Sequence, residues 1–334
     1  MLFEGVRAAA AAQIIERSLI VGGYEIEQGS RPYLVNIRYG DTLHMCGGSL
    51  ISPHAVLTAA HCVYPWGNEI IYVDFNLHSL NEIEKETSEW REVQNYNDSV
   101  VIHPDYWDED EGGFWAGNDA AIIFLSEPVT SVEPVILNDD STVPAAGAPL
   151  DVSGWGDMSG WGGDFPTAAH AVTVYAMSNE KCTSEFLYEE GNITDSMMCV
   201  YAEGRSNCKG DSGGPHVLGT KDGGPQFPVV QVGIVSWGTT SDSVPCNSSE
   251  YPRVVTRVSS IASWIKETVC SETMELCEED VTRQDNPISH GVRRWPLNLW
   301  KSWALMTVGN YLILSNQFFG DWFISIGTYL MLSI

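Results

Sequence analysis

The chain has 334 residues, with 44 acidic and 17 basic side chains and a formal net charge of -27. This length can bury a core of the size that an enzyme needs. The negative charge argues against nucleic acid or an anionic membrane as a partner, because like charges repel.

Eight cysteines form an even set that lacks the paired Cys-x2-Cys and His spacing of tetrahedral zinc sites. They are Cys46, Cys62, Cys182, Cys199, Cys208, Cys246, Cys270 and Cys277. Such a set favours disulfides formed in an oxidising compartment. The sequons at Asn97, Asn192 and Asn247 are compatible with glycosylation in that compartment. We therefore expect a secreted or extracellular protein.

The first 19 residues do not contain a clear secretory signal. Glu4 and Arg7 come early, and the run from Ala8 to Ala12 is short and weakly apolar. We expect residues 1–19 to be a propeptide or an incomplete signal region.

Residues 20 to about 256 alternate short apolar runs with Gly, Pro, Asn and Asp. In YLVNIRY, residues 33–39, the residues alternate with the period of two that is typical of a half-buried strand. The runs HAVLTAA, DAAIIFL, QVGIVSW and RVVTRV also predict strands, so the spacing indicates an all-β barrel or sandwich. The one strong helix is expected in IASWIKET, after the candidate N-caps Ser259 and Ser260.

The end of the chain changes character twice. Residues 270–294 are polar and acidic, and we expect a linker in which Cys270 and Cys277 close a small loop. Residues 295–334 are apolar and aromatic, but polar residues such as Asn310 and Asp321 interrupt any span of about 20 apolar residues. A membrane anchor, an interfacial or partner-binding tail, and an unstructured end all remain open.

Six motifs follow one another along the chain: IVGG (20–23), CGGSLISPHAVLTAAHC (46–62), GNDAAIIFL (117–125), SGWG (153–156), CKGDSGGP (208–215) and IVSWG (234–238). Together they resemble the chymotrypsin/trypsin-like serine protease family over residues 20–269. The resemblance implies an all-β fold of two six-stranded antiparallel β-barrels with the active site between them, a C-terminal helix and, here, a C-terminal extension.

A serine hydroxyl is a weak nucleophile at neutral pH, so it needs a base whose orientation and charge are supported by a third group. By resemblance, His61 is the general base, Asp119 the orienting carboxylate and Ser212 the nucleophile. The chain order His, Asp, Ser is the order of this family. The backbone N–H groups of Gly210 and Ser212 are expected to form the oxyanion hole.

The resemblance also implies disulfides Cys46–Cys62, Cys182–Cys199 and Cys208–Cys246. Ser236 resembles the serine that supports the triad aspartate, and residues 236–238 resemble the strand that pairs with the substrate backbone. In the family, a cut before the IVGG-type sequence frees an amine that pairs with the aspartate before the nucleophile. Here this activation pair is Ile20 and Asp211, and the bond that must break follows Leu19 rather than Arg or Lys. We expect a non-tryptic activator or a trimming step.

The residues expected at the substrate pocket are Ser206, Asn207, Lys209, Ser236, Trp237, Gly238 and Arg253. Ser206 takes the place where trypsin-like enzymes have Asp, which argues against a preference for Arg or Lys. Arg253 resembles an arginine that points into the pocket of granzyme-B-like relatives and selects acidic residues, and Lys209 adds a second positive charge. In the alternative, Arg253 folds away to pair with a local acid, and the pocket is chymotrypsin-like and takes apolar residues.

The sequence predicts no cofactor and no metal, since Glu82, Glu84 and Glu86 lack the regular spacing of calcium ligands. The expected function is a serine endopeptidase made as a zymogen. Its expected partners are protein or peptide substrates, an activating protease and protein inhibitors. A catalytically silent, protease-like binding protein is the alternative from another class.

Overall fold

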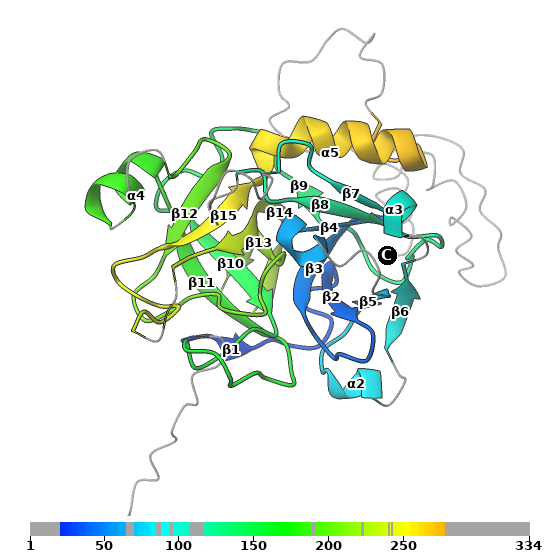
Figure 1. Cartoon of the computed structure of the whole chain (residues 1–334), viewed down its shortest axis with the longest axis horizontal. Helices are drawn as coiled ribbons and strands as arrows, with labels where there is room; N and C mark the ends of the chain where they lie inside the picture. Colours follow the sequence, from blue (N-terminus) through cyan, green and yellow to red (C-terminus); the bar gives the residue numbers. More distant parts are fainter. Residues whose placement is uncertain are drawn as a thin grey trace, which may run out of the picture. The chain divides into compact units, whose positions relative to one another are not determined.

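Two sheets of mainly antiparallel strands form the framework of the described chain (Figure 1). The computed structural model describes residues 21–277 except 65–69, 85–87, 94–95, 107–116, 187, 189–191, 222–223, 240 and 242. The acidic linker beyond Cys277, the apolar tail and residues 1–20 therefore lie outside the described residues.

The first sheet has the strand order β6-β5-β2-β3-β4-β8-β7. Its strands are β2 (Leu34–Tyr39), β3 (Cys46–Ser52), β4 (Ala55–Thr58), β5 (Ile71–Phe75), β6 (Glu89–Glu92), β7 (Val100–Ile102) and β8 (Ala121–Phe124). Every neighbouring pair in this sheet is antiparallel.

The second sheet follows the order β1-β11-β10-β13-β14-β15-β12, and an additional β11–β12 pairing closes six of these strands into a ring. Its strands are β1 (Tyr24–Glu25), β9 (Ile136–Leu137), β10 (Pro149–Gly154), β11 (His170–Met177), β12 (Met197–Tyr201), β13 (Pro215–Lys221), β14 (Gly224–Trp237) and β15 (Arg253–Arg257). The short β9 lies off this path and pairs with β14 in parallel.

The prediction of an all-β fold with two antiparallel barrel-like units and a C-terminal helix is confirmed. The strand count differs in the first unit. Within the described residues it is an open path of seven strands, whereas the second is a closed six-stranded ring with β1 and β9 attached.

The strand predicted at residues 33–39 is present as β2, but the prediction that it is half-buried is wrong. In β2 both faces are buried, and only Arg38 is partly exposed. Leu34 packs in a cluster with Trp155 on the far face of the strand, and the amide of Asn36 donates to Asp74 and to the carbonyl oxygen of Leu43. A polar side chain in the alternating pattern therefore marks an internal hydrogen bond and not contact with water.

The C-terminal helix is α5 (Val258–Thr273), and it starts earlier than the sequence predicts. Its N-cap is Arg257, while Ser259 and Ser260 lie in the first turn, where the hydroxyl of Ser260 donates to the carbonyl oxygen of Arg257. The buried face of α5, including Ile261 and Ile265, packs into the core of the first sheet. The shorter helices are α1 (Ala60–Val63), α2 (Asn81–Glu84), α3 (Tyr96–Ser99) and α4 (Asn179–Glu185).

The disulfide Cys270–Cys277 closes the end of α5. No helix among the described residues combines the length and the apolar character needed to cross a membrane. The expected boundaries of the linker at 270–294 and of the tail at 295–334 stay predictions.

Candidate active site

His61 and Asp119 meet at the edge of the first sheet. His61 lies in α1, directly after β4, and Asp119 comes just before β8, the neighbour of β4. The Nδ1 atom of His61 lies 2.7 Å from Oδ2 of Asp119, and the backbone N–H of His61 donates to Oδ1 at 3.0 Å. With its Nδ1–H donated to the carboxylate, the imidazole keeps an acceptor lone pair on Nε2.

Two donors from the second sheet hold Asp119, one at its carboxylate and one at its backbone. Ser236 on β14 donates to Oδ2 at 2.5 Å, and Thr256 on β15 donates to the backbone carbonyl oxygen at 2.9 Å. Burial alone would raise the pKa of Asp119, which is 3% exposed, but His61 and the hydroxyl of Ser236 hold it below its ordinary value. The carboxylate therefore stays charged at neutral pH.

The same pairing changes the pKa of the imidazole. Burial alone would lower the pKa of His61, but the charge of Asp119 and the hydrogen bond to it raise that pKa above its ordinary value. An imidazole with a raised pKa is a stronger base and stays neutral above that value, as proton abstraction requires.

Ser212 lies in a tight turn before β13 that abuts the segment leading into His61. Its carbonyl oxygen accepts from the N–H of Gly47 at 2.8 Å. The next residue, Gly213, has a φ of +77°, and a Cβ there would clash with the side chain of Thr58 and lie 3.0 Å from the backbone nitrogen of Ala59. Only glycine fits this close approach, which brings the turn of Ser212 to α1.

The backbone around Ser212 presents two N–H groups without a partner among the described residues. Asp211 and Gly213 donate their N–H groups to the carbonyl oxygens of Cys208 and Val235, whereas Gly210 and Ser212 donate to none of the described residues. The carbonyl of Gly210, which has a φ of +96°, is turned away toward Nε2 of His44 at 2.8 Å. This arrangement can stabilise negative charge on a substrate oxygen.

Asp211 is fully buried behind the turn. Its carboxylate accepts from the N–H groups of Gly156 at 2.9 Å and Cys208 at 2.8 Å. Burial raises the pKa of Asp211 to about 7 in spite of these bonds. Ile20 lies outside the described residues, but Val21 is buried against the disulfide Cys208–Cys246.

Among the expected pocket residues, Ser206 and Asn207 are buried. The hydroxyl of Ser206 donates to the carbonyl oxygen of Asn207, and its N–H donates to that of Val21. Trp237 stacks edge-on against Tyr188, with the ring centroids 5.4 Å apart. Lys209 is exposed, unlike the buried pocket residues Ser206 and Asn207. Its side chain lies next to Gly162, where an added Cβ would be 3.3 Å from its Nζ.

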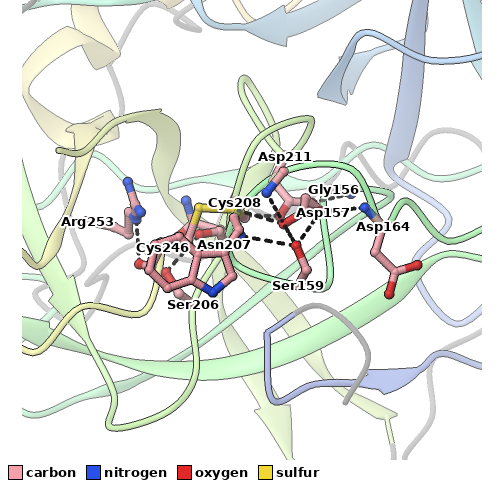
Figure 2. The surroundings of a disulfide bond; sticks show 12 residues. Gly156, Asp157, Ser159, Asp164, Ser206, Asn207, Cys208, Asp211, Cys246 and Arg253 are labelled. Atoms are coloured by element: carbon pink, nitrogen blue, oxygen red, sulfur yellow. Dashed lines mark hydrogen bonds between the residues drawn. A yellow bond between two sulfur atoms is a disulfide. The ribbon is translucent and has the colours of Figure 1, made fainter. Parts of the chain in front are cut away.

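Arg253 is only 6% exposed and lies on β15 beside Gly238. Its Nε donates to the carbonyl oxygen of Cys246 at 2.9 Å, as Figure 2 shows. The Nη2 atom is buried without a hydrogen-bond partner among the described residues. The guanidinium makes no ion pair with an acid among them. Burial lowers the pKa of Arg253 to about 10, so the guanidinium is still charged at neutral pH.

All eight cysteines are paired, as Cys46–Cys62, Cys182–Cys199, Cys208–Cys246 and Cys270–Cys277. Cys46, His61 and Cys62 are the one cluster of three metal-ligand side chains in the described part of the chain. Both sulfurs are tied up in a disulfide and the imidazole is paired with Asp119, so the cluster does not suit a metal. Asn97 is exposed, while Asn192 and Asn247 are partly exposed. Glycosylation at these positions stays a prediction.

The sequence reasoning missed three supporting residues. His44 bonds to the carbonyl of Gly210, Thr256 to that of Asp119, and Tyr188 to that of Pro252 next to Arg253. Each acts on a backbone oxygen far away along the chain, so no local pattern marks it. A surface pocket of about 740 Å³ lined by Tyr175, Tyr201 and Arg205 contains none of the candidate site residues.

A histidine paired with a buried carboxylate, beside a serine in a glycine turn, is the site of a serine endopeptidase. The profile of the Trypsin family matches residues 20–265, and the chain belongs to this family. It is 33% identical over 272 residues to human putative trypsin-6, covering 80% of this chain and 96% of that protein. It is 35% identical to rat glandular kallikrein-10, over 79% of this chain and 93% of the relative. A structure of neuropsin, a serine protease of mouse brain, superimposes with a TM-score of 0.60 and 29% identity, covering 74% of this chain and 98% of neuropsin.

Proposed function

We propose that the chain hydrolyses peptide bonds through an acyl-enzyme formed on Ser212. The hydroxyl of Ser212 attacks the scissile carbonyl while Nε2 of His61 takes its proton, and His61 then gives this proton to the leaving amine. In the second step, a water molecule attacks the acyl-enzyme while His61 again takes a proton, and the carboxylic acid product is released from Ser212. The observation that carries this proposal is the 2.7 Å pairing of His61 with Asp119, which sets the imidazole in the tautomer of a general base.

Active-site labelling tests this proposal. A fluorophosphonate probe should label Ser212 in the activated chain and leave the Ser212→Ala variant unlabelled. The alternative, a catalytically silent binding protein, predicts no labelling of either form. All three triad residues are present, which favours the enzyme.

The proposed specificity is for an acidic residue before the scissile bond, Asp above all. Arg253 supports it, because its charged guanidinium is buried beside Gly238 with Nη2 free of a described partner. A buried charge without a directly bonded counter-ion is costly, and a substrate carboxylate would supply the bonded partner. The alternative is a preference for apolar residues, which the same buried charge disfavours.

A peptide-library profile separates these two specificities. Cleavage after Asp, with Glu second, is expected in the parent. In Arg253→Gly this preference should fall by at least about tenfold, and apolar residues should replace it. Cleavage after Phe, Tyr or Leu that is the same in both forms would rule out the acidic preference.

The proposal includes a zymogen that is activated by a cut after Leu19, so that the new amine of Ile20 pairs with Asp211. Two observations support it: Asp211 is a buried carboxylate whose bonds come only from N–H groups, and the neighbouring Val21 is already buried beside Cys208. The activator is a non-tryptic protease, or a trimming step follows a tryptic cut after Arg17. Active enzyme whose N-terminal sequence begins at Ser18 would contradict this.

We also propose export to an oxidising compartment, encounter with protein inhibitors, and no nucleic-acid partner. The pairing of all eight cysteines supports export, and the charge of -27 argues against nucleic acid. The encounter with inhibitors rests on membership of the Trypsin family alone. Association of the apolar tail with a membrane is tested by partitioning the full chain and a form ending at Val269 between buffer and vesicles.

A further inference from the structure

The surface pocket of about 740 Å³ lies on the second sheet, where β11 pairs with β12 (Figure 1). Tyr175 and Met177 line it from β11, and Tyr201 lines it from β12. None of the candidate active-site residues belongs to its lining. Because small-molecule sites usually have volumes of about 300–1,000 Å³, the pocket has the size of a binding site for a small molecule.

Two tyrosines form an aromatic wall of this pocket. Tyr175 and Tyr201 lie directly opposite each other in the antiparallel pairing of β11 with β12, so their Cβ atoms are about 5 Å apart. Tyr201 also packs against Phe186, with the ring centroids 5.8 Å apart. Tyr175 is 43% exposed. An exposed aromatic ring inside a pocket offers apolar surface that a ligand can bury.

Two cations and one acid, Lys181, Arg205 and Glu203, line the same pocket. Lys181 pairs with Glu185 at 3.5 Å, whereas Arg205 makes no ion pair with an acid among the described residues. The whole chain has 44 acidic and 17 basic side chains, so an arginine without an acidic partner is a local exception. The guanidinium of Arg205 is therefore available to an anionic group of a ligand.

The lining of the pocket is held in place by packing and by backbone hydrogen bonds. A Cβ on Gly22 would lie 2.6 Å from Cγ of Arg205, so the stem of this arginine packs against the backbone of Gly22. In another part of the lining, the N–H of Gly147 donates to the carbonyl oxygen of Ala176 at 2.8 Å. A site whose walls are already fixed loses little conformational entropy when a ligand binds.

We propose that this pocket binds a small aromatic carboxylate, whose ring packs against Tyr175 and Tyr201 and whose carboxylate pairs with Arg205. The planar guanidinium presents a fork of donors that matches the two oxygens of a carboxylate. Glu203 repels a second negative charge, so the site prefers a single carboxylate to a dicarboxylate. This binding does not depend on the proposed peptidase activity.

The test uses the full chain and three naphthalene probes, with isothermal titration calorimetry to measure Kd and stoichiometry. 2-Naphthoate should bind to one saturable site. The neutral 2-naphthamide keeps the rings but loses the charge-assisted bond, so its Kd should be higher by about tenfold or more. 2,6-Naphthalenedicarboxylate should also bind more weakly than 2-naphthoate. Absence of saturable 2-naphthoate binding, or equal Kd values for 2-naphthoate and 2-naphthamide, would overturn the inference.

Substitutions on two walls of the pocket locate the bound probe. Arg205→Ala should raise the Kd of 2-naphthoate by about tenfold or more, because it removes the charge-assisted bond. Tyr175→Ala should raise it several-fold, whereas Tyr175→Phe keeps the ring and should bind like the parent. Lys266→Ala, which removes a positive charge from α5 outside the pocket lining, should not change it. An unchanged Kd in both Arg205→Ala and Tyr175→Ala would overturn the inference, since the probe would then bind elsewhere.

Glu203→Gln is a variant in which binding should improve. Without the repelling charge, the Kd of 2-naphthoate should fall several-fold, and that of 2,6-naphthalenedicarboxylate should fall further. Damage to the fold would weaken binding instead, so this gain separates the effect of the charge from a loss of structure. Kd values that do not fall for either probe would overturn the proposed preference for a single carboxylate.

Discussion

Arg253 lies so close to Gly238 that no side chain fits between them. A Cβ on Gly238 would lie 2.8 Å from Cδ and 2.9 Å from Cζ of Arg253. The lack of a side chain at Gly238, directly after β14, therefore allows the guanidinium on β15 to occupy its buried position.

We expect Gly238→Val to displace the guanidinium of Arg253 and to lower kcat/KM for substrates with Asp before the bond by about tenfold or more. Cleavage after apolar residues should suffer less. The double variant Gly238→Val with Arg253→Gly removes the clash, so its effect on the Asp preference should match that of Arg253→Gly alone. Additive effects of the two substitutions would show that they act separately.

The pH dependence of activity should report on the pair of His61 and Asp119. His61 must be neutral to accept a proton, and its pKa lies above the ordinary value of about 6.5, so kcat/KM should rise with pH through a midpoint above that value. Asp119→Asn removes the charge that raises this pKa. Its midpoint should move to lower pH, and kcat should fall by roughly 10⁴-fold, the effect known for this triad in relatives. A midpoint that does not move would show that another group controls the loss of activity at low pH.

The stability of the uncleaved chain should fall as pH rises, because of Asp211. Burial raises the pKa of Asp211 to about 7, against about 3.9 when unfolded. The folded state therefore binds more protons between these values, and the free energy of unfolding decreases as pH rises through this window. Asp211→Asn should raise the Tm of the uncleaved chain at pH 8 by a few degrees and change it little at pH 4.

After cleavage the same substitution should act in the opposite direction, because the amine of Ile20 then loses its partner. Asp195→Asn, at an exposed position, is the control for removal of a carboxylate. Equal Tm losses in cleaved and uncleaved Asp211→Asn would contradict the activation pair.

His216 should make the fold sensitive to acid. It is fully buried on β13, both ring nitrogens lack a partner among the described residues, and burial lowers its pKa to about 3. Below about pH 6.5 the unfolded chain binds a proton that the folded chain does not, so stability is lost from there down to about pH 3. His216→Leu should reduce this slope by up to one proton, about 1.4 kcal/mol per pH unit.

His216→Gln separates titration from packing in this experiment. Glutamine keeps polar atoms in the core but does not titrate, so the variant should show the same reduced slope with lower stability overall. Urea unfolding between pH 4 and 7 measures both quantities. Unchanged slopes in both variants would show that His216 does not control acid unfolding.

Short contiguous motifs predicted the fold class, which is confirmed, and the triad residues, which stay a prediction, because this chemistry depends on local sequence. TAAHC places His61 beside a disulfide, and GDSGGP builds the turn of Ser212 from glycines that permit positive φ. Residues that are adjacent in the sequence meet these requirements, so a local pattern can predict them. The sequence patterns failed where burial depended on a distant partner, as in β2, where Asn36 is buried because Asp74 lies on the neighbouring strand.

The place of Arg253 and the pocket at β11 and β12 were decided only by tertiary contacts. The sequence leaves two orientations of Arg253 open, into the pocket or folded away to pair with a local acid. Among the described residues Arg253 packs against Gly238 and Cys246 and makes no ion pair with an acid, which supports the proposed pocket orientation. No motif marked the pocket lined by Tyr175 and Arg205, because its residues come together only after β11 pairs with β12. Residue types therefore specify the reacting groups, while the geometry of the substrate site follows from long-range packing that no local pattern encodes.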